Sequence, residues 1–441
     1  MLPGRGTASL SPRAVPTAVD NPRSPSTVRH KILATTFLVA FIMYLDRVCM
    51  GTAAPTIMRE FGLDKIAMGW SVSAFNWAYA IFQVPGGWMA DRYGARLILA
   101  VALAWWSVFT AATGASVNAG SLMVTRFLFG VGEAAAFPAS SRAVVRWLPV
   151  DQRGFGQGVQ HAGSRLGAAV APALVVYLLT RTTWRWVFCL FGCAGAVLSF
   201  FWLWFYRNTP SEHPDVNDEE LNVIGPAACA PVKQRAKVPW RQIARSRDLW
   251  FLSMMYFCYG WVLWMYLFWI PTYLVEARHF NQLKMGLGAS LPLLAATATN
   301  VAGGWISDRL SLRWNNLRRG RLAVSVIGFG VAAIGLVPGV LAQDALTGLL
   351  CLTLALAGLE LTVPVSWAIS LDIGGDFSGS VSGVMNTLGN LGGALSAVVI
   401  GYLATRMGWN WPFLIASAMC LTAALLATRI NPNRSAVGSR I

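Results

Sequence analysis

Long apolar segments separated by short polar ones fill most of this chain. After a polar stretch at residues 1–31, twelve apolar segments follow one another. Each is close to the roughly 20 residues that a helix needs to cross a bilayer. The expected spans are residues 32–57, 66–90, 95–116, 120–146, 155–181, 184–206, 249–276, 284–307, 321–342, 345–371, 380–406 and 411–430. The pattern therefore predicts an all-α membrane protein with twelve transmembrane helices.

A long polar interval, residues 207–248, divides these spans into two sets of six. The expected organisation is a basic tail (1–31), a six-helix bundle (32–206), a central loop (207–248), a second six-helix bundle (249–430) and a short tail (431–441).

The two sets of spans also repeat in sequence. Residues 154–188 align without gaps with residues 379–413, and 13 of these 35 positions are identical, including tryptophan, tyrosine and arginine. Parallel repeats of this kind are typical of transporters whose binding site lies near the middle of the membrane.

Composition excludes several classes of protein. Hydrophobic residues make up 55% of the chain and charged residues only 12%, whereas soluble proteins carry about 25% charged residues. A disordered chain and a nucleic-acid-binding domain are disfavoured despite the net charge of +16, because neither is so apolar. We find no nucleotide-binding loop, no metal-ligand spacing and no pairing of nucleophile and base, so we expect neither an enzyme nor a cofactor.

The positive charges predict the orientation in the membrane. With both termini on the inner side, 25 of the 35 Lys and Arg residues lie on that side and 7 on the outer side. The other three, Arg47, Arg126 and Arg165, fall within spans. Because inner loops of membrane proteins are enriched in Lys and Arg, both termini are expected in the cytoplasm. We favour a bacterial cytoplasmic membrane and a monomer whose only large partner is the lipid bilayer.

Two acids and two arginines in spans 1 and 4 are the main candidates for function: Asp46, Arg47, Arg126 and Glu133. Charge inside a membrane is costly and usually marks a substrate or proton path. Arg126 and Glu133 are seven residues apart, so they share a helix face about 10 Å apart. Arg47, with Arg126, is expected to hold a substrate carboxylate, and Asp46 and Glu133 to exchange protons. The alternative is a structural ion-pair cluster.

Three further ionisable residues leave alternatives open. Arg165 in span 5 either contacts a second substrate carboxylate or neutralises Glu133. His161 either contacts substrate and titrates near neutrality or is a packing histidine, and the packing role is favoured. Glu360 in span 10 is either a third protonatable group or an acid that bridges helices, and the bridging role is favoured.

Polar and aromatic residues within spans supply candidate contacts to substrate hydroxyl groups and carbon atoms. The alternative for each is helix packing or a lipid-facing position. The candidates are Tyr44, Tyr79, Gln83, Gln160, Ser164, Tyr266, Trp269, Ser366, Trp367, Asn386 and Asn390.

Charged residues at the inner ends of the spans are candidates for gating. A carboxylate at Asp91 can meet the positive N-terminus of a neighbouring helix and an arginine such as Arg142. Such a contact would hold one state of a transport cycle closed. Arg92 belongs to the same set, and Asp308 and Arg309 repeat it in the second half. The alternative is that these are solvated charges that only set orientation.

Five motifs in order resemble the major facilitator superfamily and, within it, the anion:cation symporter family. They are Tyr44-Leu-Asp46-Arg47, Tyr79-Ala-Ile-Phe-Gln83-Val-Pro85-Gly-Gly87 continuing into Gly87-Trp-Met-Ala-Asp91-Arg92-Tyr-Gly94-Ala-Arg96, Arg126-Phe-Leu-Phe-Gly-Val-Gly-Glu133-Ala-Ala-Ala-Phe137-Pro138, Trp269-Ile-Pro271-Thr-Tyr273-Leu, and Gly383-Val-Met-Asn386-Thr-Leu-Gly389-Asn390-Leu-Gly392-Gly393. The resemblance implies two pseudo-symmetric six-helix bundles. It also implies proton and carboxylate sites at Asp46, Arg47, Arg126 and Glu133.

The expected function is therefore proton-coupled symport of an organic anion, such as an aldonate, an aldarate, a hexuronate or a related carboxylate, by alternating access. The sequence leaves Na⁺ open as the coupling ion. Export of a drug, or exchange of another organic anion, is the alternative within transport. A membrane receptor that has lost transport is the alternative outside it.

Overall fold

The computed structural model describes residues 24–63, 65–225 and 238–436, and everything regular within them is helical. Parts of three expected regions lie outside the described residues: positions 1–23 of the basic tail, 226–237 of the central loop and 437–441 of the final tail.

Each of the twelve expected spans is present as helix. The first half, called the N half below, contains α1 (Val28–Phe61), α2 (Lys65–Tyr93), α3 (Ala95–Gly114), α4 (Ala119–Glu133), α5 (Ala136–Trp147), α6 (Arg153–Leu179) and α7 (Trp184–Phe205). The second half, called the C half, contains α11 (Arg247–Glu276), α12 (Gln282–Arg313), α13 (Leu317–Leu341), α14 (Ala345–Gly374), α15 (Ser378–Met407) and α16 (Asn410–Arg429). Between the halves lie the short helices α8 (Asp218–Ile224) and α10 (Trp240–Arg245).

The fourth expected span is present as one segment, Ala119–Trp147, but its helix is interrupted within the span. α4 ends at Glu133 and α5 begins at Ala136. Pro138 lies in the first turn of α5, where its missing N–H removes the bond that would continue the helix from the preceding turn. The break places Glu133 at a helix end. The helix α12 is also longer than expected, since it runs six residues past position 307 to Arg313.

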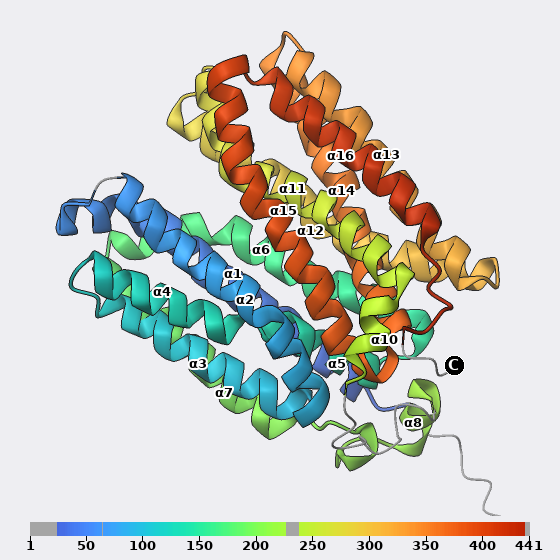
Figure 1. Cartoon of the computed structure of the whole chain (residues 1–441). Coiled ribbons are helices and arrows are strands. Elements are labelled where there is room, and N and C mark those ends of the chain that lie inside the picture. Colours follow the sequence, from blue (N-terminus) through green and yellow to red (C-terminus); the bar gives the residue numbers. More distant parts are fainter. Residues whose placement is uncertain (1–23, 64, 226–237, 437–441) are drawn as a thin grey trace, which may run out of the picture.

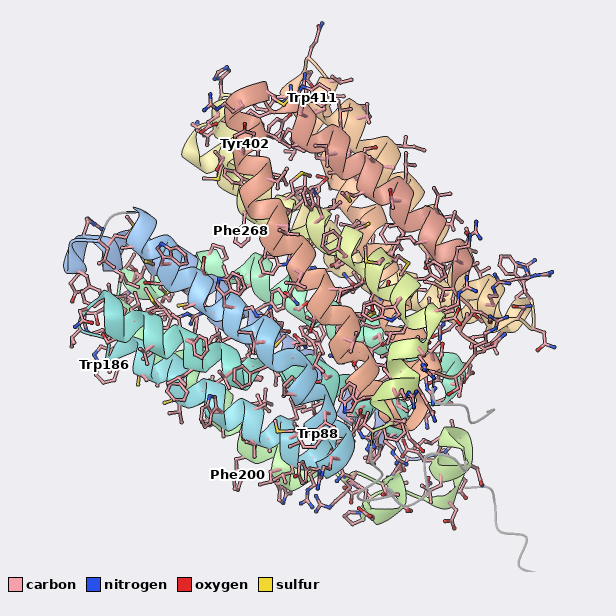
Figure 2. All side chains as sticks on the ribbon, in the orientation of Figure 1. Trp88, Trp186, Phe200, Phe268, Tyr402 and Trp411 are labelled. Carbon is pink, nitrogen blue, oxygen red and sulfur yellow. The ribbon has the colours of Figure 1, made fainter. Side chains whose placement is uncertain are left out.

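The outer surface of the bundle is apolar. In the part of the chain that the structure describes, nine segments are long and apolar enough to cross a membrane, and one of them covers both α14 and α15. Large side chains such as Trp186, Phe200 and Tyr402 are more than 60% exposed on the outside of the helices (Figure 2). Such a surface is suited to lipid tails rather than to water.

The two halves meet at one end and diverge at the other (Figure 1). The short helices α8 and α10 lie at the end where the halves meet, which we call the loop end. Contact between the halves is made mainly by α2 against α15 and by α6 against α12. Between the halves, residues of α1, α2, α5, α6, α11, α14 and α15 surround a shared interior.

Candidate functional site

The interior between the halves holds a small cavity of about 40 Å³. Helices of both halves line it. Its lining residues are Tyr44, Arg47, Tyr79, Phe137, His161, Arg165, Tyr256, Tyr259, Gly260, Leu263, Trp264, Trp367, Asn386, Gly389 and Asn390.

On the N-half wall of this cavity, Arg47 pairs with Glu133. The Arg47 Nε donates to a Glu133 carboxylate oxygen at 2.8 Å, and the Glu133 side chain is fully buried. The guanidinium of Arg47 also lies over the rings of Tyr44 and Tyr79, at 4.8 Å and 4.6 Å from their centroids. These contacts fix the planar group at the cavity surface.

Asp46 and Arg126 lie behind this pair, in electrostatic contact with Glu133 and with each other. The Thr110 hydroxyl donates to Asp46 at 3.4 Å, and the Arg126 guanidinium lies 4.2 Å from the Phe129 ring centroid. The structure thus brings together the two acids and two arginines that the sequence analysis placed in one site.

Several buried polar atoms of this cluster make no hydrogen bond to the described residues. Five buried atoms of this cluster have no hydrogen-bond partner among the described residues: Asp46 Oδ1, Glu133 Oε1, Arg47 Nη2, and Arg126 Nε and Nη1. Leaving a buried polar atom unpaired costs about 1–3 kcal/mol, and more when the group is charged. The cluster is therefore suited to taking up a proton on a carboxyl and an anion on a guanidinium.

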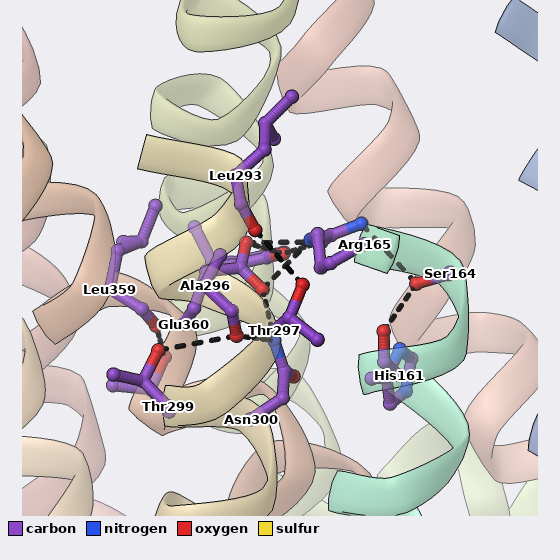
Figure 3. A network of polar contacts seen from close by, with 12 residues as sticks. His161, Ser164, Arg165, Leu293, Ala296, Thr297, Thr299, Asn300, Leu359 and Glu360 are labelled. Carbon is purple, nitrogen blue, oxygen red and sulfur yellow. Dashed lines mark hydrogen bonds and ion pairs between the residues drawn. The ribbon is translucent and has the colours of Figure 1, made fainter. Parts of the chain in front are cut away.

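Arg165 has a different partner from the one considered in the sequence analysis. Its Nε and Nη2 donate to the two carboxylate oxygens of Glu360, at 2.9 Å and 3.0 Å. The pair joins α6 of the N half to α14 of the C half (Figure 3). The interpretation that Arg165 neutralises Glu133 is therefore wrong, because the fork of Arg165 is occupied by a nearer carboxylate from the opposite half.

Two more side chains complete the Glu360 site. The Tyr259 hydroxyl donates to Glu360 at 3.0 Å and accepts from Arg165 at 2.8 Å. The Asn300 amide donates to the other Glu360 oxygen at 2.8 Å. Glu360 consequently touches helices α6, α11 and α12 from α14, which is the bridging position that the sequence analysis favoured.

Aromatic rings form the part of the cavity next to His161. The His161 ring stacks on Phe137 at 4.9 Å and lies 5.2 Å from Trp367, whose Nε1 donates to the Tyr256 hydroxyl at 2.8 Å. This stacking is typical of a packing histidine, but the ring also lines the cavity and its Nε2 is buried with no partner among the described residues, so both roles of His161 stay open.

Several predicted contact residues lie outside the cavity lining. One polar atom of each of four donates to a backbone carbonyl: Gln83 to Ala134, Ser164 to His161, Tyr266 to Leu352 and Ser366 to Thr362. The Gln83 Oε1 is buried with no partner among the described residues. Gln160 is buried, and Trp269 packs against Trp409. Their predicted contact with substrate has no support in this geometry.

The α11 face of the cavity was missed by the sequence analysis. Tyr256, Tyr259, Gly260, Leu263 and Trp264 line it. Their spacing of three or four residues is that of one helix face, and this was the available signal. Asn386 and Asn390 on α15 are in the lining as predicted, and an Asn386 amide contact to the Tyr79 hydroxyl at 3.5 Å crosses between the halves.

At the loop end, Asp91 of α2 lies against the first turn of α15. It accepts backbone N–H bonds from Gly379 at 2.9 Å and Ser380 at 2.6 Å, and Arg142 donates to it at 2.7 Å. The free N–H groups and the positive dipole of a helix N-terminus both favour a carboxylate there. We call these four residues the Asp91 latch.

The same contact recurs between α12 and α6. Asp308 accepts from the backbone N–H of Gly154 at 3.3 Å and Phe155 at 2.7 Å, and Arg321 donates to it at 2.6 Å. We call this the Asp308 latch. Gly154 and Phe155 are the positions that align with Gly379 and Ser380 in the repeat, so the two latches are related by the pseudo-symmetry of the chain.

Arginine 92 and arginine 309 do not join the latches. Arg92 lies over Trp88, and Arg309 lies over Trp305, each 5.3 Å from the ring centroid. Arg321, which the sequence analysis missed, contacts Asp308 instead and also donates to Asp372 at 3.4 Å. Its partners are 13 and 51 residues away in sequence, a spacing that no single motif covers.

The glycine four residues before each latch aspartate, Gly87 before Asp91 and Gly304 before Asp308, has a steric reason. A side-chain carbon at Gly87 would collide with the backbone carbonyl of Gly379, and one at Gly304 with that of Gly154. Each glycine therefore allows the close helix crossing that brings its latch together.

Comparisons with known proteins agree with this architecture. The profile described as Major Facilitator Superfamily matches residues 36–397. A probable sulfoacetate transporter of Cupriavidus necator is 39% identical over 407 residues, covering 92% of this chain and 94% of that protein. A probable galactarate/D-glucarate transporter of Bacillus subtilis is 31% identical over 417 residues, covering 91% of each.

A solved structure also has this fold. The crystal structure of the human organic anion transporter MFSD10 superposes with a TM-score of 0.73 at 17% identity, covering 91% of this chain and 100% of that one. The match confirms the expected all-helical membrane fold, and the profile confirms the resemblance on which that expectation rested.

Proposed function

The chain belongs to the major facilitator superfamily, and from that premise we propose that it carries an organic anion into the cell together with protons. The superfamily consists of membrane transporters, so the chain is a multi-pass membrane transporter and not an enzyme. The substrate class and the coupling ion are the proposed part.

The cavity chemistry supports an anionic substrate. The side chain of Arg47 lines the cavity, and its Nη2 is buried from solvent and has no partner among the described residues. A guanidinium binds a carboxylate through two parallel hydrogen bonds. The named relatives, a sulfoacetate and a galactarate/glucarate transporter, support a small organic acid as the substrate.

The acids beside Arg47 support proton coupling. Glu133 has only one of its oxygens bonded, and so does Asp46. When an anion binds Arg47, it competes with Glu133 for the same guanidinium, and a proton on Glu133 removes that competition. Anion and proton therefore favour each other's binding, which is the linkage that a symporter requires.

The latches support alternating access. With the Asp91 and Asp308 latches formed, the halves are held together at the loop end. Opening toward that end requires both sets of bonds to break. The excess of Lys and Arg on the same side supports a cytoplasmic loop end, so the state with both latches formed is the one closed to the cytoplasm.

The Arg47–Glu133 pair, with Asp46 and Arg126 behind it, is the observation that carries the proposal. Its test is uptake by purified protein in liposomes under an inward proton gradient, using galactonate, galactarate, glucuronate and sulfoacetate. We expect at least one acid to accumulate above its outside concentration, and to stop when a protonophore is added. Failure of all four to accumulate would contradict the proposal.

A further inference from the structure

The cavity is lined by two arginines and by no carboxylate. Arg47 and Arg165 both contribute to its surface, while none of the described aspartate or glutamate side chains does. A site built for a single carboxylate needs one guanidinium, so the second cation requires an explanation of its own.

Each of these arginines is hydrogen-bonded to a glutamate that lies outside the cavity lining. Glu133 bonds to Nε of Arg47, and Glu360 bonds to Nε and Nη2 of Arg165. Both glutamates are fully buried and lie outside the cavity lining. The glutamates therefore position the two cations without placing negative charge on the cavity surface.

The Arg165 fork keeps one nitrogen nearly free. Its Nε and Nη2 are occupied by Glu360 and Tyr259, whereas Nη1 has only a long contact of 3.5 Å with the Ser164 hydroxyl. Since Arg165 lines the cavity and Glu360 does not, Nη1 is the donor that remains for a ligand.

The two arginines are close enough for one small molecule to reach both. The guanidinium carbon of Arg47 lies 4.8 Å from the centroid of the Tyr44 ring, and that of Arg165 lies 5.6 Å from the same centroid. The amide groups of Asn386 and Asn390 line the same cavity from the C half and can bond to hydroxyl groups between the two ends of a ligand.

We propose that the cavity recognises an organic dianion, with one anionic group on Arg47 and the second on Arg165. A short dicarboxylate or sulfocarboxylate fits this arrangement, and a hydroxylated chain would use the asparagine amides. The inference rests on the proposed function, because it names the substrate class of the same site. Arg165 is then the residue that distinguishes dianions from monoanions.

The test is a set of matched ligands that differ by one anionic group. Galactarate and galactonate share a six-carbon hydroxylated chain, and sulfoacetate differs from acetate and from methanesulfonate by one anionic group. Affinities for the full-length purified protein are measured by calorimetry. We expect at least one dianion to bind about 10-fold more tightly than its monoanion partner, the usual effect of one additional charged contact.

Variants then assign that preference to Arg165. Arg165→Gln removes the second cation but leaves Glu360 buried without its partner, so the double variant Arg165→Gln/Glu360→Gln is tested beside it. In the double variant we expect the preference for the dianion to fall below about 3-fold, with monoanion affinity changed by less than that factor.

The outcomes separate the two proposals. If the wild-type protein binds none of these anions, the proposed function itself fails. If it binds monoanions as tightly as dianions, or if the preference survives in the double variant, only the assignment of a dianion to Arg165 is overturned.

Discussion

Two arginines in one cavity, each paired with a glutamate, differ in how completely they are bonded. Arg165 and Glu360 form a bidentate pair, and Tyr259 and Asn300 complete the bonds of the carboxylate. Arg47 and Glu133 share a single bond, and each keeps a buried atom unpaired among the described residues. We call these the complete pair and the incomplete pair.

The difference teaches that burial and charge alone do not identify the coupling site. Breaking the complete pair leaves a bare buried charge, so its carboxylate serves best as a fixed support. The incomplete pair lies between Asp46 and Arg126, which can share its charge as protons and anions bind. We therefore assign exchange of protons to the incomplete pair and positioning of a cation to the complete pair.

The largest effect is expected from Arg47→Ala. Removing two charge-assisted hydrogen bonds of about 1.5–3 kcal/mol each lowers anion affinity by about 100-fold or more. The measurement is calorimetry with the best ligand of the panel. Arg181→Ala, at an exposed arginine, is the matched control, and retained binding in Arg47→Ala would refute the role of the incomplete pair.

Asp46→Asn should separate proton coupling from binding. The amide cannot take up a proton, so accumulation against a gradient is lost, while exchange of labelled for unlabelled anion across the liposome membrane continues. Both are measured in the same preparation. Accumulation by Asp46→Asn at the wild-type level would show that the proton is carried elsewhere.

Glu360→Gln should cost more stability than Glu133→Gln. Breaking a buried ion pair costs about 3–5 kcal/mol. The Glu360 carboxylate accepts four hydrogen bonds, which the substitution weakens or removes, whereas the Glu133 carboxylate accepts one. Apparent melting temperatures of the two purified variants are compared. Equal temperatures, or the reverse order, would break the distinction between the complete and incomplete pairs.

Gly87→Ala tests whether the latches affect transport without affecting anion binding by the complete and incomplete pairs. The added methyl group would collide with the Gly379 carbonyl, and overpacking costs about 1–3 kcal/mol, so uptake should fall about tenfold with anion affinity unchanged. Gly51→Ala is the control, because a side-chain carbon there meets nothing within 4 Å. Equal uptake by the two variants would count against the latch.

The smallest effect is expected from Arg92→Ala. Arg92 lies over Trp88 and outside the Asp91 latch, so uptake should stay within about twofold of wild type, as for most surface substitutions. Arg142→Ala, which removes a latch donor, is the comparison and should lower uptake more. A loss in Arg92→Ala as large as that in Arg142→Ala would restore the gating role that the sequence analysis gave Arg92.

Much of the fold could be predicted because bilayer thickness fixes the length of each apolar segment. The same analysis brought Asp46, Arg47, Arg126 and Glu133 together, since span direction and helix rise set their depth. It missed the break between α4 and α5, although Pro138 was its local signal.

The partner of Arg165 could not be predicted in this way. Glu360 lies 195 residues away in the opposite half, and their contact depends on how far each helix is rotated about its axis and on how the halves close. Helix α6 carries small and polar side chains on more than one of its faces. Its sequence therefore does not determine which face turns toward the other half. The same limit explains why Arg321 was missed and why Tyr266 and Ser366 were expected in the cavity.

The central claim, that anion and proton bind at the same cluster, has a direct measurement. Anion is added to purified protein in weakly buffered detergent solution, and the change in pH is recorded with an indicator dye. Because the linkage is reciprocal, binding should draw protons from solution and raise the pH. The double variant Asp46→Asn/Glu133→Gln should bind anion without that change. Wild-type protein that binds anion and takes up no proton, at any pH where it is stable, would contradict the account.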